Sequence, residues 1–239
     1  MKKIIVTLFA ASALFAACNK DYPVPNADGP FISSIEISGR TENAYSFEYD
    51  AKGQLTKVLE YSLEDEEKPL EQYYTYEYSK GKIEQKLCSV GGEVKSTLTH
   101  TLNSKGYIVK TSDGTKDIEF SYDSEGHLVK SGNTSFTWSG GDIVSNSDGA
   151  VYTPSEVMNP GFWPVTEAGT DNWLYLVGRY GKFSKHLPAE INNESAKELV
   201  LCEYEMEGGS LVRVEKSVTI TAGNTPSITG FNYNIFWMK

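Results

Sequence analysis

The side chains with the greatest chemical reactivity in this sequence are three histidines and three cysteines: His100, His127, His186, Cys18, Cys88 and Cys202. A zinc site needs three or four converging ligands. No histidine here has a second His or Cys at ligand spacing. Gly-x-Ser-x-Gly elbows, phosphate-binding Gly-Lys-Ser/Thr loops and full calcium loops do not occur in the sequence either. We therefore expect no metal, no cofactor and no catalytic residues.

The charge balance excludes one class of partner. The 239 residues hold 22 Lys+Arg and 32 Asp+Glu, for a net charge of −10. Nucleic-acid binding needs clustered Lys and Arg against the phosphates, so we expect no nucleic-acid partner. A carboxylate pair for glycoside hydrolysis stays open, because Asp and Glu could meet across a closed sheet. Nothing in the sequence singles out such a pair, and an enzyme is the least favoured interpretation.

Aromatic surface is what the sequence offers for recognition. Trp138, Trp163 and Trp173 could stack on sugar rings, which present an apolar face beside polar groups. Packing in the core is the competing interpretation. It is favoured most for Trp173, which lies on an apolar stripe with Leu174 and Val177. Trp163 lies in a Pro-rich loop, and loops on a rigid scaffold are where binding usually occurs.

A modification site is predicted at Cys18. Lys2 and Lys3 precede an apolar stretch over residues 4–17, which is the pattern of a secretory signal peptide. The stretch ends in Phe15-Ala-Ala-Cys18, which resembles the bacterial lipobox, whose Cys thiol carries a diacylglyceryl group. We therefore predict a signal peptide over residues 1–17 and a lipid anchor at Cys18, with an ordinary soluble signal peptide as the alternative.

Residues 18–30 are expected to form the lipidated start and a Pro-rich tether, since Pro23, Pro25 and Pro30 favour extended backbone. Asn19 and Lys20 follow Cys18, so the Asp that marks inner-membrane retention is absent from that position. We predict a lipid-anchored protein of the bacterial outer membrane, surface-exposed or periplasm-facing. With Cys18 lipidated, Cys88 and Cys202 remain. We expect two unpaired thiols, with a disulfide as the alternative in this oxidising compartment.

The rest of the chain alternates between apolar and polar residues, with one face buried and one wet, as antiparallel sheets do. Tyr45, Phe47 and Tyr49 share one face, and Gly-containing turns such as Asp50–Gly53 and Asp123–Gly126 follow the strands. The pattern predicts an all-β antiparallel β-meander forming a large curved sheet or near-closed barrel. One short helix is expected within residues 170–181. A membrane-spanning barrel is disfavoured, because strands of five to eight residues with a polar second face cannot present a lipid-facing band.

Two motifs carry resemblances. Phe47–Lys57 and Phe120–Lys130 share the pattern aromatic-polar-Tyr-Asp-x-x-Gly-polar-Leu-x-Lys, with a looser copy at Thr101–Lys110, and resemble YD repeats. The stretch Gly178–Pro188 resembles one in an uncharacterised bacterial lipoprotein family, a domain of unknown function described as having a porin-like β fold. That resemblance implies a single β domain over residues 31–239 and supplies no activity.

Two function classes follow. The first is a non-catalytic lipoprotein that binds a glycan, another extracellular ligand or a protein through its loops. The second is a structural or assembly accessory of the cell envelope that docks a partner protein. The sequence names neither the ligand nor the partner.

Overall fold

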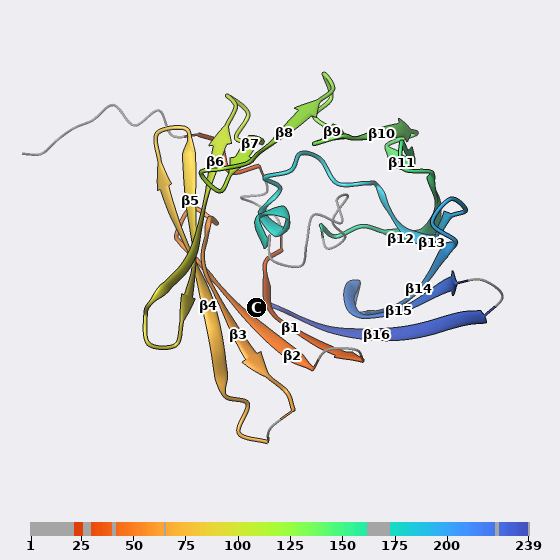
Figure 1. The fold of residues 1–239 in the computed structure, drawn as a ribbon, viewed down its shortest axis with the longest axis horizontal. Helices are drawn as coiled ribbons and strands as arrows, with labels where there is room; N and C mark the ends of the chain where they lie inside the picture. Colours follow the sequence, from red (N-terminus) through yellow and green to blue (C-terminus); the bar gives the residue numbers. More distant parts are fainter. Residues whose placement is uncertain are drawn as a thin grey trace, which may run out of the picture.

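The structure is a computed structural model that describes residues 22–25, 30–39, 42–64, 66–161, 173–222 and 225–238. Its strands form one closed antiparallel barrel in which each strand pairs with its neighbours in sequence. The barrel closes where β1 (Ile32–Gly39) pairs with β16 (Thr225–Trp237), as Figure 1 shows. The expected all-β meander is therefore confirmed, and the sheet is a closed barrel of 16 strands.

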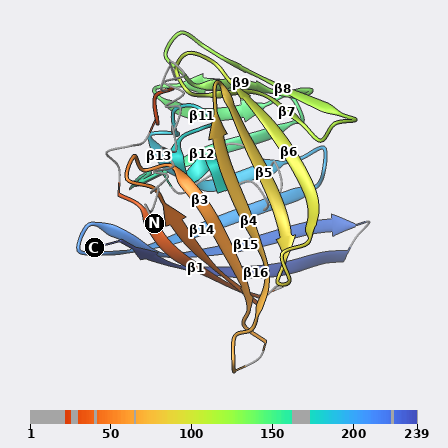
Figure 2. The same cartoon turned by 90° about the vertical axis from the view of Figure 1, so that its left-hand side faces the viewer.

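The first half of the barrel follows a regular up-and-down path, and Figure 2 shows several of its strands side by side along one wall. These strands are β2 (Asn43–Tyr49), β3 (Leu55–Ser62), β4 (Leu70–Ser79), β5 (Lys82–Ser89), β6 (Val94–Leu102), β7 (Ile108–Ser112) and β8 (Asp117–Tyr122).

The second half continues the path with β9 (Leu128–Ser131), β10 (Thr134–Ser139), β11 (Asp142–Asn146), β12 (Ala150–Met158), β13 (His186–Asn193), β14 (Glu198–Glu207) and β15 (Ser210–Ala222). The expectation of five to eight residues per strand is wrong for the longer strands: β4, β6, β12 and β14 have 9 or 10 residues each, and β15 and β16 have 13. Their pairing continues almost to the ends of both strands, from Arg213 opposite Asn234 to Ala222 opposite Thr225.

The alternation along each strand places apolar side chains inside the barrel and charged ones outside. In β4, Tyr74 and Tyr76 are buried in the core, whereas Glu77 points outward and forms an ion pair with Lys86 of β5 at 3.1 Å. Lys110 of β7 and Asp117 of β8 pair in the same way on the outer wall. The outer wall therefore carries ion pairs, whereas a lipid-facing wall would carry an apolar band.

Asp and Asn side chains shape the turns at one end of the barrel. The Asp50 Oδ1 accepts hydrogen bonds from the backbone N–H groups of Lys52 and Gln54, both at 2.9 Å. Asn103 does the same for Lys105 and Tyr107. Each of these turns includes a glycine in the left-handed region, as the sequence predicts.

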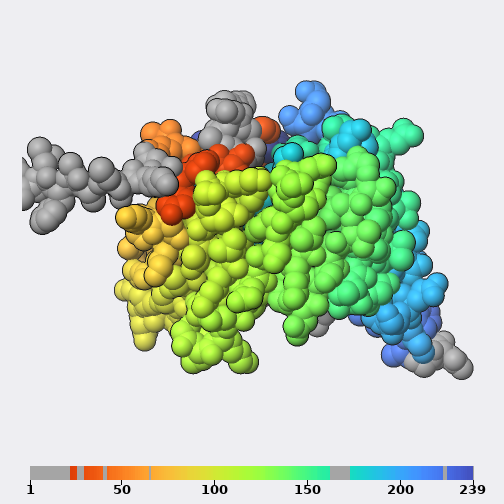
Figure 3. Space-filling model, turned by 90° about the horizontal axis from the view of Figure 1, so that it is seen from above, coloured from red at the N-terminus to blue at the C-terminus, as the bar shows by residue number. Residues whose placement is uncertain are grey.

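Because the strands are antiparallel, the hairpin turns divide between two ends of the barrel. We call the end with turns 50–54, 79–82, 103–107, 123–127, 139–142 and 207–210 the capped end. The other end, with turns 63–69, 89–93, 113–116, 147–149 and 194–197, is the mouth. The leading segment Tyr22–Pro25 lies at the capped end, where Tyr22 packs on Gly81. It is visible in red along one edge of the molecule in Figure 3.

A single helical element lies inside the barrel among the described residues. The 3-10 helix η1 (Trp173–Val177) lies within the ring of strands (Figure 1) and buries Trp173, Leu174, Leu176 and Val177. The predicted short helix is confirmed in position, but it is a single 3-10 stretch. It ends because Gly178 adopts a φ of 70°. Nowhere in the described residues is there a helix with the length and apolar character to span a membrane.

The two cysteines in the described residues are both free. Cys88 lies on β5 and Cys202 on β14, and each is buried, with 5% and 7% of its surface exposed. Cys202 faces a small apolar cluster with Ala150, Ile191 and Val200 near the mouth. The expectation of unpaired thiols is therefore confirmed.

Candidate functional site

The capped end is closed by the segment Gly178–His186, which we call the strap. Its donors meet the glycine carbonyls of three successive turns. The Arg179 Nη1 donates to Gly106 O at 3.0 Å, Lys182 N to Gly126 O at 2.9 Å, and Lys185 N to Gly141 O at 2.9 Å. The donors recur at every third residue. The stretch Gly178–Pro188, which carries the family resemblance, therefore has a structural role, because it connects three turns by hydrogen bonds.

Arg179 is the central residue of the strap and is fully buried. Besides Gly106, its guanidinium donates to Pro23 O at 2.9 Å and to Gln54 Oε1 at 3.3 Å. It also lies 5.5 Å from the centre of the Tyr78 ring. These contacts tie the leading segment, two turns and the strap together, which closes this end of the lumen.

A Ser, a His and an Asp do meet where the strap joins β13. The Asp142 carboxylate accepts from Ser184 Oγ at 3.2 Å and lies 2.8 Å from His186 Nδ1. Burial opposes ionisation of Asp142, but the hydrogen bonds from His186 and Ser184 outweigh it and lower the pKa of this carboxyl. Nucleophilic catalysis requires the serine beside the histidine, whereas here the aspartate lies between them. The cluster fixes the strap and is not a catalytic triad.

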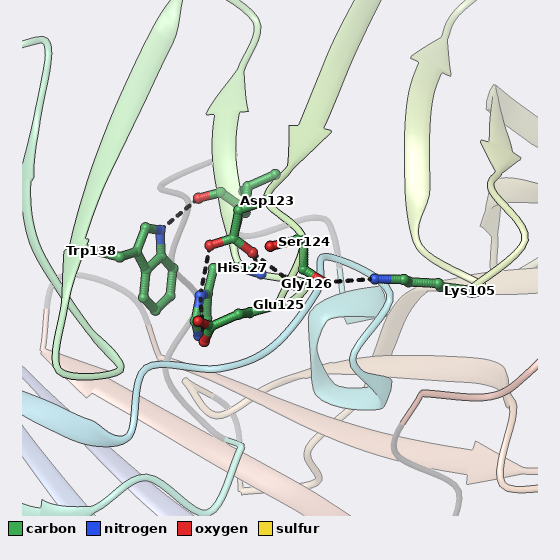
Figure 4. Close-up of polar contacts among 8 residues, drawn as sticks. Lys105, Asp123, Ser124, Glu125, Gly126, His127 and Trp138 are labelled. Atoms are coloured by element: carbon green, nitrogen blue, oxygen red, sulfur yellow. Dashed lines mark hydrogen bonds and ion pairs between the residues drawn. The ribbon is translucent and has the colours of Figure 1, made fainter.

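Trp138 also lies at the capped end, against a turn (Figure 4). Its ring stacks on His127, with centroids 4.5 Å apart and planes 18° apart, and its Nε1 donates to Leu128 O at 2.8 Å. His127 Nδ1 in turn lies 2.9 Å from Asp123 Oδ2. One face of the indole and its N–H are therefore engaged by the turn.

The other tryptophans are not brought together with Trp138. Trp173 is 3% exposed and packs against Tyr45 and Phe47, with ring centroids 4.6 and 5.1 Å away. Trp163 and Cys18 lie outside the described residues. A ligand-binding role for the three tryptophans stays a prediction, and the structure separates Trp138 and Trp173 from the cavity described next.

The mouth holds a cavity of about 400 Å³ between those ends of β8 to β14 that lie at the mouth. Its apolar lining comes from Ile118, Phe136, Ala150, Tyr152, Ile191 and Val200. Its polar lining comes from Ser131, Thr134, Asn146, Asp148, Asn193 and Glu198. Size and composition match the usual small-molecule site, which is an apolar cleft with a few convergent polar groups.

Hydrogen bonds hold the polar groups of the mouth in fixed positions. Asn146 Oδ1 accepts from the backbone N–H groups of Asp148 and Ala150, at 3.0 and 2.9 Å, and its Nδ2 lies 3.3 Å from the Tyr152 hydroxyl. Thr134 Oγ1 donates to Asp148 Oδ2 at 2.6 Å. The site is thereby organised before any ligand arrives, which lowers the entropic cost of binding.

The lumen beside the cavity is lined by a second polar network on β5, β6 and β7. The ring of His100 lies 2.8 Å from Thr111 Oγ1 and 3.1 Å from Gln85 Oε1, and it is fully buried. Burial lowers the pKa of His100 to about 4, so the imidazole is neutral near pH 7. On β3, Glu60 accepts from Asn43 and Gln72. These groups have protein partners and make a polar inner wall.

Sequence reasoning did not single out the residues of the cavity. The available signal was a polar residue in an inward position, such as Asn193, two residues after the buried Ile191. The signal is weak because each strand contributes only one or two side chains. Among the described residues, no three His, Cys, Asp or Glu side chains come together as a candidate metal site.

The comparisons with known proteins agree with the barrel. A porin-like protein from Bacteroides uniformis ATCC 8492 has 17% identity and a TM-score of 0.61, over 91% of this chain and 98% of that one. A porin-like protein from Bacteroides vulgatus ATCC 8482 has 12% identity and a TM-score of 0.52, over 87% and 99%. No curated protein matches the chain, and no catalytic family is indicated. The family model described as "Domain of unknown function (DUF4595) with porin-like fold" matches residues 47–206, so the chain belongs to that family.

Proposed function

We propose that this protein is a lipid-anchored barrel of the bacterial outer membrane that binds a neutral glycan in its mouth without catalysing a reaction. The observation that carries the proposal is the cavity between β8 and β14, which combines aromatic rings with fixed amides in a barrel closed at its other end. The anchor at Cys18 rests on the signal pattern and the lipobox resemblance.

The lining supports a sugar more than a purely apolar ligand. Phe136 and Tyr152 bring aromatic rings to the lining, and an aromatic face suits the C–H face of a pyranose. Asn146 and Asn193 bring side-chain amides to the same cavity, and amides can donate to and accept from hydroxyl groups. Within the protein, Asn146 Nδ2 lies 3.3 Å from the Tyr152 hydroxyl and Asn193 Nδ2 donates to Asp148 O, so one of the two N–H groups of each amide is already used. A purely apolar ligand would offer no acceptor to the second N–H of either amide, at a cost of about 1–3 kcal/mol for each unpaired donor.

The charge of the cavity supports a neutral ligand over an anionic one. Asp148 and Glu198 contribute carboxylates, and none of the described residues that line the cavity is Lys, Arg or His. An anionic polysaccharide would bring like charges together, which disfavours binding. A neutral oligosaccharide has no such penalty and can donate hydroxyl hydrogens to the same carboxylates.

A thermal-shift screen tests the proposal. Neutral oligosaccharides, anionic polysaccharides and divalent cations would each be added to the purified protein. A ligand that binds the folded state at a hundredfold excess over its dissociation constant adds about 2.7 kcal/mol of stability. We expect neutral oligosaccharides to raise the unfolding midpoint and anionic polysaccharides to leave it unchanged.

Two variants locate the effect. Tyr152→Leu removes an aromatic face from the cavity but keeps an apolar side chain, and we expect it to abolish most of the shift. Val151→Ala changes the adjacent residue, which is 56% exposed on the outer wall, and should keep the shift. A flat screen across all three ligand classes would contradict glycan binding. It would leave the docking of a partner protein as the better account.

A further inference from the structure

Six exposed lysines lie at the capped end of the barrel. The turns and the strap there present Lys52, Lys80, Lys82, Lys105, Lys182 and Lys185, all exposed. Beside Arg179 and these six lysines, the same turns hold the carboxylates of Asp50, Asp123, Glu125, Asp142 and Glu207, of which only Glu125 and Glu207 are exposed. Although the protein as a whole is acidic, this end therefore carries a local excess of positive charge.

The mouth has the opposite charge. Its turns expose the carboxylates of Glu64, Glu66, Glu67, Glu93, Asp113, Asp148 and Glu194. The exposed lysines in these turns are Lys68, Lys116 and Lys197, and the exposed Lys95 follows turn 89–93. The barrel is consequently polarised along its axis, with a basic capped end and an acidic mouth.

The leading segment is fixed to the basic end. The carbonyl oxygen of Pro23 accepts from Arg179, and the Tyr22 ring packs on Gly81, where a Cβ would lie 2.9 Å from the Tyr22 hydroxyl. Only three residues separate Tyr22 from Cys18, so the chain between their Cα atoms spans at most about 14 Å. An acyl group on Cys18 would thus hold the capped end near the bilayer.

We propose that the capped end is the membrane-facing surface of the barrel, with its lysines against anionic phospholipid headgroups and the mouth directed away. Both observations lead to the same orientation: the short connection to Cys18 and the attraction of lysines to an anionic surface, which also repels the acidic mouth. The inference rests on the lipid anchor of the proposed function and is independent of the ligand in the mouth.

Fluorescence quenching in vesicles tests this orientation. The acylated protein would be placed in phosphatidylglycerol-containing vesicles that carry a headgroup-linked quencher. A single probe would be attached through Ser104→Cys in a turn of the capped end or through Val90→Cys in a turn of the mouth. The native Cys88 and Cys202 are buried, so we expect the probe to react little with them. The protein without added cysteines measures this background labelling. The two probes are roughly 20–30 Å apart along the strands.

We expect at least threefold stronger quenching of the Ser104 probe than of the Val90 probe. Equal quenching, or stronger quenching at position 90, would overturn the orientation. Vesicle retention and the mass of the acylated Cys18 are measured first. If the protein lacks an acyl group, the anchor fails and the orientation fails with it, whatever the mouth binds.

A matched pair of charge reversals tests the lysines. K80E/K105E at the capped end and K95E/K116E at the mouth change the net charge equally. Lys105 and Lys95 each donate one side-chain hydrogen bond, to Ser124 O and Gln72 Oε1. We expect K80E/K105E, and not K95E/K116E, to reduce the difference in quenching between the two probes. The reduction should occur in vesicles that contain phosphatidylglycerol and not in vesicles of phosphatidylcholine alone. Equal effects of both reversals would contradict a headgroup contact through these lysines.

Discussion

The backbone N–H of Lys182 donates a hydrogen bond to the carbonyl oxygen of Gly126 at 2.9 Å, joining two segments that are 56 residues apart. This bond is the middle one of the three that the strap makes to glycine carbonyls. The strap must approach each turn closely, and glycines on both sides make this approach possible.

Gly181 should be the strap residue least tolerant of a side chain. Its φ is +93°, and an added Cβ would lie 2.5 Å from Gly126 O and 2.8 Å from the Tyr122 ring. We expect Gly181→Ala to lower the free energy of unfolding by more than about 2 kcal/mol, measured by urea denaturation. Gly208→Ala is the control, because its φ is also positive and no atom lies within 4 Å of the added Cβ. It should cost about 1 kcal/mol. Similar losses in both variants would contradict the close approach of the strap.

Arg179 should contribute more to stability than any arginine on the surface. Arg179→Met keeps a similar volume but leaves the carbonyl of Gly106, in a buried hydrogen bond, and that of Pro23, in a partly buried one, without their donor. An unpaired buried acceptor costs about 1–3 kcal/mol and a partly exposed one less, so we expect a total loss of roughly 2–4 kcal/mol. In the control Arg213→Met, the arginine is 42% exposed in an ion pair with Glu215, and the loss should be at most about 1 kcal/mol. If the two variants lose equal stability, Arg179 does not fasten the strap.

His100 makes the barrel sensitive to mild acid. Its pKa is about 4 in the folded protein, against about 6.5 in an unfolded chain, because burial disfavours the charged imidazole. The unfolded state therefore takes up a proton first as the pH falls. The contribution of His100 is complete above pH 6.5 and is lost between pH 6.5 and 4, by on the order of 3 kcal/mol.

The measurement is the free energy of unfolding by urea at several pH values over this range. His100→Gln removes the titrating group and keeps a polar side chain between Gln85 and Thr111. We expect a flatter pH dependence in the variant than in the wild type. Parallel curves for the two proteins would show that His100 is not the source of the acid sensitivity.

Local features of the fold could be predicted from the sequence, because their causes are local. The alternation of Tyr74 and Tyr76 with polar residues fixed which face is buried. Asp123 and Gly126, three residues apart, predict a turn. In the structure the Asp123 Oδ1 accepts a hydrogen bond from the Gly126 N–H at 2.7 Å. The apolar stripe at Trp173 likewise predicts a helical element with a buried face, and the structure places that element inside the barrel.

Closure of the barrel and the mouth cavity could not be predicted in the same way. Ile35 of β1 pairs with Ile235 of β16, and no local pattern specifies a partner 200 residues away. The cavity joins one or two side chains from each of several strands. Asn193 is therefore one of several polar residues in β13, and nothing singles it out until Asn146 and Tyr152 are placed in the same cavity.

The most direct test of glycan binding in the mouth is a crystal structure of the protein with a neutral oligosaccharide that raises its unfolding midpoint. We expect density for a sugar ring in the mouth, against Phe136 or Tyr152 and within hydrogen-bond distance of Asn146 or Asn193. Sugar density only at the capped end or on the outer wall, with the mouth cavity holding water alone, would contradict it.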